Sequence, residues 1–253
     1  TADKFVEFGE QNGMVVHGHT LIWHSQTPRW FFKDDAGNEI DKEELTKRMQ
    51  EHIATVVTRY KGRIKSWDVV NEAVLDDGSL RESKFYKLLG EDFIKIAFEA
   101  AHEADPDAEL YYNDYSTSIP EKRDGIVRMI KNLQDQGVPI HGVGMQGHVG
   151  MDYPELKEFE KTIEAFSDLG LKVAVTEFDI TVLPSPWKNQ GAEVSANFDY
   201  EDRMNPYPEK LPDSVNNAFN ARCLDFFKLF LKHEDKLDKV TMWGVNDGNS
   251  WRN

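Results

Sequence analysis

The stretch SWDVVNEAV, residues 66–74, begins as a strand and ends in an amide beside a carboxylate. Val69 and Val70 are β-branched and apolar, which is typical of a strand, and Asn71 and Glu72 follow directly. Simple alternation along a strand would place these two polar side chains on opposite faces. Both reach one site only if a bulge or the end of the strand turns one of them. The question raised by this stretch is whether the strand positions Glu72 in a functional site.

The same alternation of a short strand and an amphipathic helix recurs along all 253 residues. The apolar periodicity predicts strands at 14–19, 64–71, 109–113, 141–147, 172–178 and 240–245, and helices at 41–61, 83–104, 120–136, 154–169 and 213–234. The long irregular stretch 181–212 is rich in proline and aromatic residues, and such a loop in a compact domain is usually functional. No repeat or linker divides the chain, so we expect one domain over 1–253.

Repeated β-α units predict an α/β fold with a parallel sheet, either doubly wound or closed as a barrel. The phosphate-binding motifs GxGxxG and GxxxxGK[ST] do not occur, which lowers the doubly wound option. In a (β/α)8 TIM barrel the chemistry lies at the C-terminal ends of the strands. Polar and aromatic residues gather there in this chain, namely His19, Asn71, Glu72, Asn113, Asp114, Gln146, His148, Glu177 and Trp243. We therefore expect a TIM barrel.

The number of predicted strands is six, whereas closure of that barrel needs eight. Residues 1–13 read as the helix of a unit whose strand is missing, and the chain stops just after the final predicted strand. We expect a single catalytic barrel domain that lacks the first two strands at the N-terminus and is slightly truncated at the C-terminus. It is either a fragment or a chain whose barrel is completed by a second polypeptide segment.

The charge and hydropathy of the chain exclude two classes of partner. The formal net charge is −15, from 45 acidic and 30 basic residues, and no basic cluster offsets it. Such a surface repels phosphate backbones, so we expect no nucleic-acid partner. No apolar run approaches the roughly 18 residues that cross a bilayer, so we expect no membrane partner. The single cysteine, Cys223, reads as a small buried apolar residue.

Glu72 and Glu177 end strands that are three β-α units apart and therefore face each other across a barrel mouth. Glycoside hydrolysis needs two such carboxyl groups, because one protonates the leaving oxygen while the other attacks or stabilises the anomeric carbon. A separation of about 5–5.5 Å would indicate retention, and about 6.5–9.5 Å inversion. Tryptophans beside the carboxylates, Trp23, Trp243 and Trp251, suit stacking on the apolar faces of sugar rings.

A metal-dependent barrel hydrolase is an alternative from a different class. His17, His19, His141, His148 and Asp179 supply candidate ligands. Such a site would usually need a bridging lysine or carboxylate and further histidines at strand ends. Acid–base chemistry on two carboxyl groups needs no metal and no cofactor, and we expect neither.

Six motifs resemble the barrel-strand motifs of family 10 glycoside hydrolases, the endo-β-1,4-xylanases. They are GHTLIWHSQTPRWF (18–31), WDVVNEA (67–73), NDY (113–115), GVGMQGHV (142–149), VAVTEFDI (173–180) and MWGVNDGNSW (242–251). The resemblance runs nearly end to end, and WDVVNE with TEFDI at this distance is highly specific. It implies hydrolysis of internal β-1,4-xylosidic bonds of xylan by a retaining double displacement. The family tendency also implies a secreted or periplasmic protein.

The resemblance implies a role for each matching residue. Glu177 matches the nucleophile and Glu72 the general acid/base, while Asn71 matches the amide that binds the 2-hydroxyl at the cleavage point. His148 matches the imidazole bonded to the nucleophile, with Gln146 beside it. The remaining matches are His19, Trp23, Trp243 and Trp251 in the glycone-side pocket, Gln26 one sugar further out, Tyr115 on the leaving-group side, and Asp179 and His24 as supporting residues.

Two other readings stay open at this point. One is another retaining β-glycanase of the same barrel clan, acting on glucan or mannan. The other is a sugar-binding barrel without hydrolytic activity. In the family, the second strand supplies a Glu-Asn pair and a lysine that bind glycone-side sugars, and that strand has no counterpart in this chain.

Overall fold

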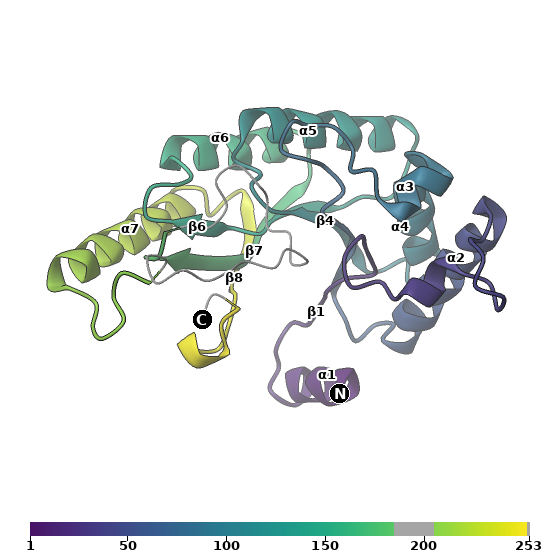
Figure 1. Cartoon of the computed structure of the whole chain (residues 1–253), viewed down its shortest axis with the longest axis horizontal. Coiled ribbons are helices and arrows are strands. Elements are labelled where there is room, and N and C mark those ends of the chain that lie inside the picture. Colours follow the sequence, from purple (N-terminus) through teal and green to yellow (C-terminus); the bar gives the residue numbers. More distant parts are fainter. Residues whose placement is uncertain (185–204, 252–253) are drawn as a thin grey trace.

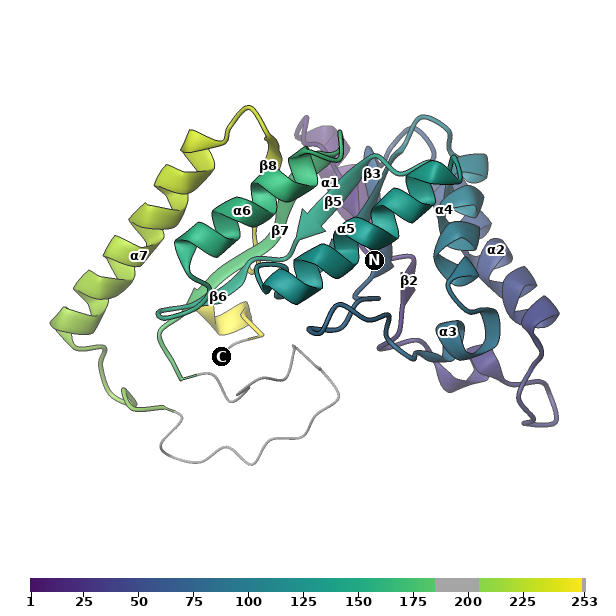
Figure 2. The same ribbon diagram turned by 90° about the horizontal axis from the view of Figure 1, so that it is seen from above.

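The computed structural model of the chain describes residues 1–184 and 205–251. Its strands form one parallel sheet that curls into part of a barrel, and helices lie along the outer side of that sheet (Figures 1 and 2). The predicted fold class, an α/β barrel of the TIM type with six strand positions, is confirmed.

Because the strands are parallel, the C-terminal ends of β3 and β7 lie at the same edge of the curved sheet. Two short strands, β1 (His17–Gly18) and β2 (Ile22–Trp23), both pair with β3 (Ser66–Asn71) and share one strand position. Next come β4 (Glu109–Asp114), β5 (Gly142–Met145), β7 (Lys172–Thr181) and β8 (Leu237–Met242), while β6 (His148–Gly150) pairs with the last part of β7.

The helices follow the strands in sequence. They are α1 (Ala2–Gln11), α2 (Lys42–Arg59), α3 (Lys84–Leu89), α4 (Asp92–Ala104), α5 (Pro120–Asp135), α6 (Leu156–Ser167) and α7 (Asp213–Lys232), with short 3-10 helices η1 (Arg29–Phe32) and η3 (Asp247–Asn249). Among the residues the structure describes, no helix is both long and apolar enough to cross a membrane.

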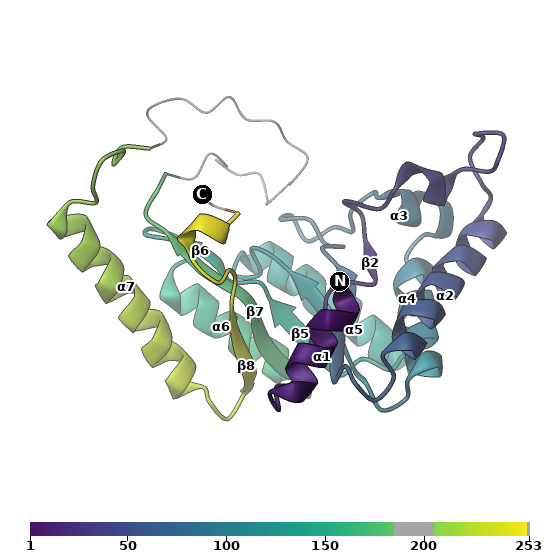
Figure 3. The ribbon, with the colours of Figure 1, turned by 90° about the horizontal axis from the view of Figure 1, so that it is seen from below.

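The sheet is open between β1 and β8. Within 1–184 and 205–251, β1 pairs only with β3, and β8 pairs only with β7. Helix α1 and β8 lie on this open side (Figures 1 and 3). A second polypeptide segment that completes the barrel stays a prediction.

Several predicted element boundaries are wrong. The expected helix 83–104 is two helices, because Gly90 adopts a φ of 63° and ends α3; glycine tolerates this left-handed conformation. The strand expected at 14–19 is reduced to β1, and the chain returns to the same position as β2. The last strand begins and ends three residues earlier than expected, at Leu237–Met242.

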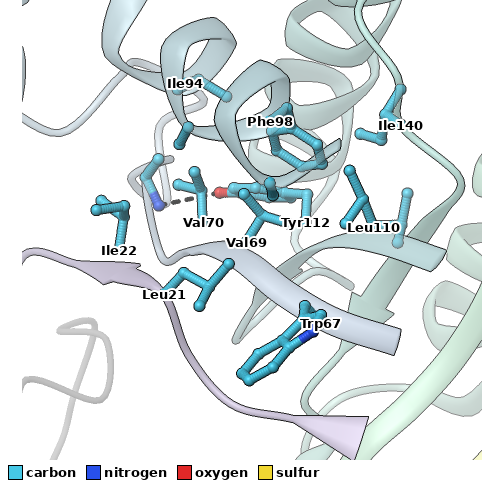
Figure 4. Packing of buried hydrophobic residues seen from close by; sticks show 14 of the residues in the cluster. Leu21, Ile22, Trp67, Val69, Val70, Ile94, Phe98, Leu110, Tyr112 and Ile140 are labelled. Carbon is cyan, nitrogen blue, oxygen red and sulfur yellow. Dashed lines mark hydrogen bonds between the residues drawn. The ribbon is translucent and has the colours of Figure 1, made fainter. Parts of the chain in front are cut away.

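Apolar side chains of the sheet and the helices form one buried core. Val70 of β3 and Tyr112 of β4 lie beside Ile94 and Phe98 of α4 (Figure 4). These four side chains are at most 1% exposed. The core thus holds β3 and β4, the strands that carry Asn71, Glu72 and Asn113 to the cleft, against the outer helices.

The segment that follows Glu72 packs backbone-to-backbone on α5. A Cβ atom added at Gly125 would lie 2.4 Å from the carbonyl oxygen of Gly78 and 2.6 Å from its Cα atom. Gly78 itself has a φ of 79° and approaches the carbonyl of Glu121. Only glycine permits this approach, and the contact fixes where the chain leaves the end of β3.

This contact gives a prediction about the substitution Gly125→Ala. Alanine inside a helix normally stabilises by about 1 kcal/mol relative to glycine. Here we expect a loss of about 1–3 kcal/mol in the free energy of unfolding, because the methyl group meets backbone that cannot move aside. Urea unfolding measures the change. Lys131→Ala, at an exposed position on the same helix, serves as the control and should stay within about 0.5 kcal/mol of the parent. A more stable Gly125→Ala variant would contradict the packing described.

Candidate active site

A bulge and a left-handed residue bring Asn71 and Glu72 to the same face. The register between β3 and β4 shifts between Asp68 and Val70, and Glu72 has a φ of 59°. As a result the Asn71 amide nitrogen donates to Glu72 Oε1 at 3.2 Å. A left-handed backbone costs a residue with a Cβ atom about 1–2 kcal/mol. The strand therefore does present Glu72, together with its neighbouring amide, to one site.

The carboxyl group of Glu72 is buried and receives neutral hydrogen-bond donors. Trp23 Nε1 donates to Oε2 at 2.8 Å, and Gln146 Nε2 donates to Oε1 at 3.0 Å. Burial raises the pKa of Glu72 above its ordinary value, and the negative charges of Asp114 and Glu177 raise it further, against the opposing effect of the two donors. The arrangement favours a protonated Glu72.

Glu177 lies in β7 and is 5% exposed. Its Oε1 accepts a hydrogen bond from Asn113 Nδ2 at 2.9 Å, and its Oε2 lies 3.2 Å from His148 Nε2. The same Asn113 nitrogen donates to Asn71 Oδ1 at 2.9 Å. One fully buried amide from β4 thus links the Glu177 carboxylate to the Asn71–Glu72 end of β3.

His148 is held between two carboxylates. Its Nε2 faces Glu177, and its Nδ1 lies 3.1 Å from Asp179 Oδ2. Burial lowers the pKa of His148, but the hydrogen bonds to Asp179 and Glu177 outweigh this effect and raise it. Trp251 Nε1 also donates to Asp179 Oδ2, at 2.8 Å. The predicted contacts of His148 with Glu177 and of Asp179 with this group are present.

Another buried carboxylate, that of Asp68, orients His17 of β1 and His19, which follows β1. His19 Nδ1 lies 2.9 Å from Asp68 Oδ2, and His17 Nε2 lies 3.0 Å from Asp68 Oδ1. Burial raises the pKa of Asp68, but the two imidazoles bring it down to about 2. The His19 ring then stands edge-on to Trp243 with the ring centroids 5.8 Å apart, and 6.4 Å from the ring of Trp23. The structure therefore groups these predicted pocket residues.

The three remaining predicted residues, Tyr115, His24 and Gln26, differ in burial and in hydrogen-bond partners. Tyr115 is buried, its hydroxyl accepting from Arg81 Nη2 at 2.7 Å. His24 borders a small cavity beside Glu72, and burial together with the cations Arg81 and Lys122 lowers its pKa to about 3. Gln26 is exposed and has a φ of 57°. Within the described part of the chain, no hydrogen bond joins Gln26 to the other site residues.

The residues of the metal hypothesis do not converge. His17 and His19 share Asp68, whereas His148 contacts Glu177 and Asp179. His141 Nδ1 accepts from the Leu110 backbone nitrogen at 3.0 Å. The five candidate ligands are thus divided among three groups, which disfavours that alternative.

Asn113 and Asp68 are functional candidates that had no role assigned from the sequence, although Asn113 was named among the polar residues at the strand ends. Asn113 is fully buried and Asp68 nearly so. Asn113 Oδ1 also accepts from Thr176 Oγ1 at 2.6 Å, which fixes the direction of its amide. The available signal was a polar residue inside an apolar strand, in ELYYND and in SWDVV. Burial makes such residues costly unless they are hydrogen-bonded.

The sequence pattern of glycosyl hydrolase family 10 matches residues 1–253. The chain belongs to glycosyl hydrolase family 10. The predicted resemblance is therefore confirmed, and with it the assignment of the chain to a glycoside hydrolase. Endo-1,4-beta-xylanase A of Xylanibacter ruminicola is 52% identical over 252 residues, which cover 100% of this chain and 68% of that protein. Endo-1,4-beta-xylanase A of Thermotoga neapolitana is 44% identical, and the match covers 100% of this chain and 22% of that protein.

Solved structures share the fold. One, described as a novel GH10 endoxylanase retrieved from sugarcane soil metagenome, matches with a TM-score of 0.93 and 52% identity over 100% of this chain and 72% of that one. Another is a mutant in complex with xylotriose, with a TM-score of 0.87 and 36% identity over 100% of this chain and 73% of that one.

The raised pKa of Glu72 predicts how this family 10 chain responds to pH. The folded state holds the Glu72 proton more tightly than the unfolded chain, so stability is lost as pH rises from near the ordinary carboxyl pKa of 4.5 through the raised value. Glutamine cannot ionise. We expect the stability of Glu72→Gln relative to the parent to increase between about pH 4 and pH 7, by about 1.4 kcal/mol for each unit by which the pKa is raised. Thermal unfolding across this range measures it, and a relative stability that falls with pH would contradict the assigned burial.

Proposed function

We propose that the protein is an endo-β-1,4-xylanase that hydrolyses internal β-1,4-xylosidic bonds of xylan with retention of configuration. The observation that carries this proposal is the single hydrogen-bonded network that joins Glu72 and Glu177 through Asn71 and Asn113. Two further facts support xylan as the substrate. The relatives are named endo-1,4-beta-xylanases, and one structural neighbour was solved with xylotriose.

The first step uses the two carboxyl groups in opposite protonation states. Ionised Glu177 attacks the anomeric carbon, while protonated Glu72 gives its proton to the leaving oxygen as the glycosidic bond breaks. Asn113 and His148 hold one Glu177 oxygen each, which fixes the carboxylate for attack. The negative field of Glu177 helps to keep the proton on Glu72 until this step.

The second step reverses these roles. Once Glu177 is a glycosyl ester it carries no charge, so the pKa of Glu72 falls and its carboxylate takes a proton from water. The water oxygen bonds to the anomeric carbon, and the ester breaks to return Glu177 as a carboxylate. Two inversions at one carbon give overall retention.

The sugar-binding roles follow the positions around this pair. Asn71 lies beside Glu72 and is assigned to the 2-hydroxyl of the sugar at the cleavage point. His19, Trp23, Trp243 and Trp251 are assigned to the glycone-side walls, with Gln26 further out and Tyr115 on the leaving-group side. Trp243 and Trp251 are 36% and 45% exposed, as an open stacking surface requires.

The function is tested on two polymers. We expect reducing ends to be released from xylan much faster than from carboxymethylcellulose, and Glu177→Gln to abolish both activities while xylohexaose still binds in calorimetry. Removal of a catalytic nucleophile typically lowers turnover by about 10⁴-fold or more. Faster cleavage of carboxymethylcellulose would favour the glucanase alternative, and near-normal hydrolysis by Glu177→Gln would remove the nucleophile assignment. Binding without cleavage by the parent would favour the sugar-binding alternative.

The acid role of Glu72 is tested with leaving groups of different basicity. We expect Glu72→Ala to lower kcat/KM for xylopentaose by about 10²–10⁴-fold, the usual contribution of general acid catalysis. The value for 2,4-dinitrophenyl β-xylobioside should change little, because that leaving group departs without a proton. Equal losses on both substrates would show that Glu72 is not the acid.

A further inference from the structure

Tyr112 and Asp114 lie on the face of β4 opposite Asn113, because side chains alternate along a strand. Both are fully buried. The Tyr112 ring belongs to the hydrophobic core and lies beside Phe98 and Val70 (Figure 4). These two residues therefore stand behind the cleft, between the sheet and the outer helices, and the proposed chemistry leaves them without a role.

The hydroxyl group of Tyr112 binds the peptide units that follow Glu72. It accepts hydrogen bonds from the backbone nitrogens of Ala73, at 3.0 Å, and of Val74, at 3.1 Å, and it donates to Asp114 Oδ2. Figure 4 shows the hydroxyl joined to a backbone nitrogen by a dashed line. Because Glu72 is left-handed, with a φ of 59°, the next two N–H groups turn away from the sheet ladder. The Tyr112 hydroxyl is the acceptor that this turn requires.

Asp114 is held as a carboxylate. Its Oδ1 accepts from the Tyr115 backbone nitrogen and from Lys122 Nζ, both at 2.9 Å. Its Oδ2 accepts from Tyr112 and, at 3.4 Å, from the Val74 nitrogen. Burial raises the pKa of Asp114 against the effects of Lys122 and Tyr112, but four donors on two oxygens leave no place for a proton. The carboxylate in turn fixes the Tyr112 hydroxyl so that its lone pairs face Ala73 and Val74.

We propose that Tyr112 and Asp114 are positioning residues for Glu72. The Tyr112 hydroxyl fixes the two peptides after Glu72 and so holds the left-handed turn from which the carboxyl group points into the cleft. Arg81 holds the backbone carbonyl groups of the same turn. The Arg81 Nε atom donates to the backbone carbonyl oxygen of Glu72 at 3.0 Å, and the Arg81 backbone nitrogen donates to the backbone carbonyl oxygen of Ala73 at 2.7 Å. The inference rests on the proposed acid role of Glu72.

Asp114 also acts on Glu72 through its charge. The charged or titratable groups that face Glu72 and Asp114 are Glu177 on β7, His19 beside β1, His24 after β2, Asp76 and Arg81 in the turn, Tyr112 and Tyr115 at β4, and Lys122 on α5. Asp114→Asn removes one negative charge and leaves the cations Lys122 and Arg81. The pKa of Glu72 should then fall, and with it the pH at which the acid loses its proton.

The test compares Tyr112→Phe with the parent on the same two substrates, in the intact protein. We expect kcat/KM for xylopentaose to fall on the order of 10²-fold, the usual effect of displacing a catalytic group by about 1 Å. The value for 2,4-dinitrophenyl β-xylobioside should stay within about 3-fold, because that substrate needs no proton from Glu72. Tyr60→Phe is the matched control: Tyr60 is also buried and donates to a carboxylate, Asp3, but it joins α2 to α1 away from the cleft. It should leave both values unchanged.

Equal losses of Tyr112→Phe on the two substrates, or no loss, would overturn the proposal. If Glu72→Ala shows selectivity for the leaving group and folded Tyr112→Phe does not, the xylanase assignment stands and this inference fails. If Glu72→Ala itself lacks the selectivity, the acid assignment fails first. Should Tyr112→Phe not fold, the pH profile of Asp114→Asn decides: we expect the basic limb of kcat/KM for xylopentaose to move to lower pH, and an unmoved limb would overturn the proposal.

Discussion

Burying two carboxyl groups beside each other is the constraint on which this site depends. Isolated buried charges are strongly unfavourable, and two like charges in one cleft raise each other's pKa. The chain meets this constraint by giving the two groups different partners. Glu72 receives neutral donors, Trp23 and Gln146, whereas Glu177 is paired with Asn113 and His148. In the proposed mechanism, this difference in partners makes Glu72 the proton donor and Glu177 the nucleophile before substrate binds.

The fold provides this asymmetry through the ends of parallel strands. The strand β3 carries Asn71 and Glu72, β4 carries Asn113, and β7 carries Glu177. One amide, that of Asn113, spans the distance between the strands. Behind the sheet, the turn after Glu72 is fixed by hydrogen bonds to Tyr112 and by the Gly78–Gly125 contact with α5. The strained backbone at Glu72 is thus supported by buried groups that do not face the cleft, as expected for a strained functional site.

Much of this arrangement could be predicted from the sequence, because the motifs lie at the C-terminal ends of the predicted strands. The structure brings His148 into contact with Glu177 and Asp179 and links Glu177 to Glu72 through Asn113 and Asn71, because the C-terminal parts of parallel strands lie at one edge of the sheet. Boundaries were less predictable. Gly90 splits one apolar periodicity into two helices, and the strand expected at 14–19 is only β1, with the unpredicted strand β2 following the stretch around His19. Periodicity reports which side is buried, not where hydrogen-bonding stops.

Residues that hold other site residues in place were the hardest to predict from the sequence. Asn113, Asp68 and Tyr112 lie in strands that read as apolar or mixed, and nothing in their local sequence reveals partners 39 to 64 positions away. Likewise, alternation predicted that Asn71 and Glu72 would diverge, and only the bulge in β3 and the left-handed φ of Glu72 bring them together. Such tertiary hydrogen bonds have no sequence period.

The proposed mechanism requires Glu177 to form a covalent bond to the sugar. A 2-fluoro xylobioside with a dinitrophenyl leaving group tests it directly, because the fluorine slows both steps while the leaving group still allows the first. Mass spectrometry of the digested protein should find one fluoroxylobiosyl group, on the peptide that contains Glu177. A label on any other residue, or release of one equivalent of dinitrophenol with no labelled peptide, would contradict the account.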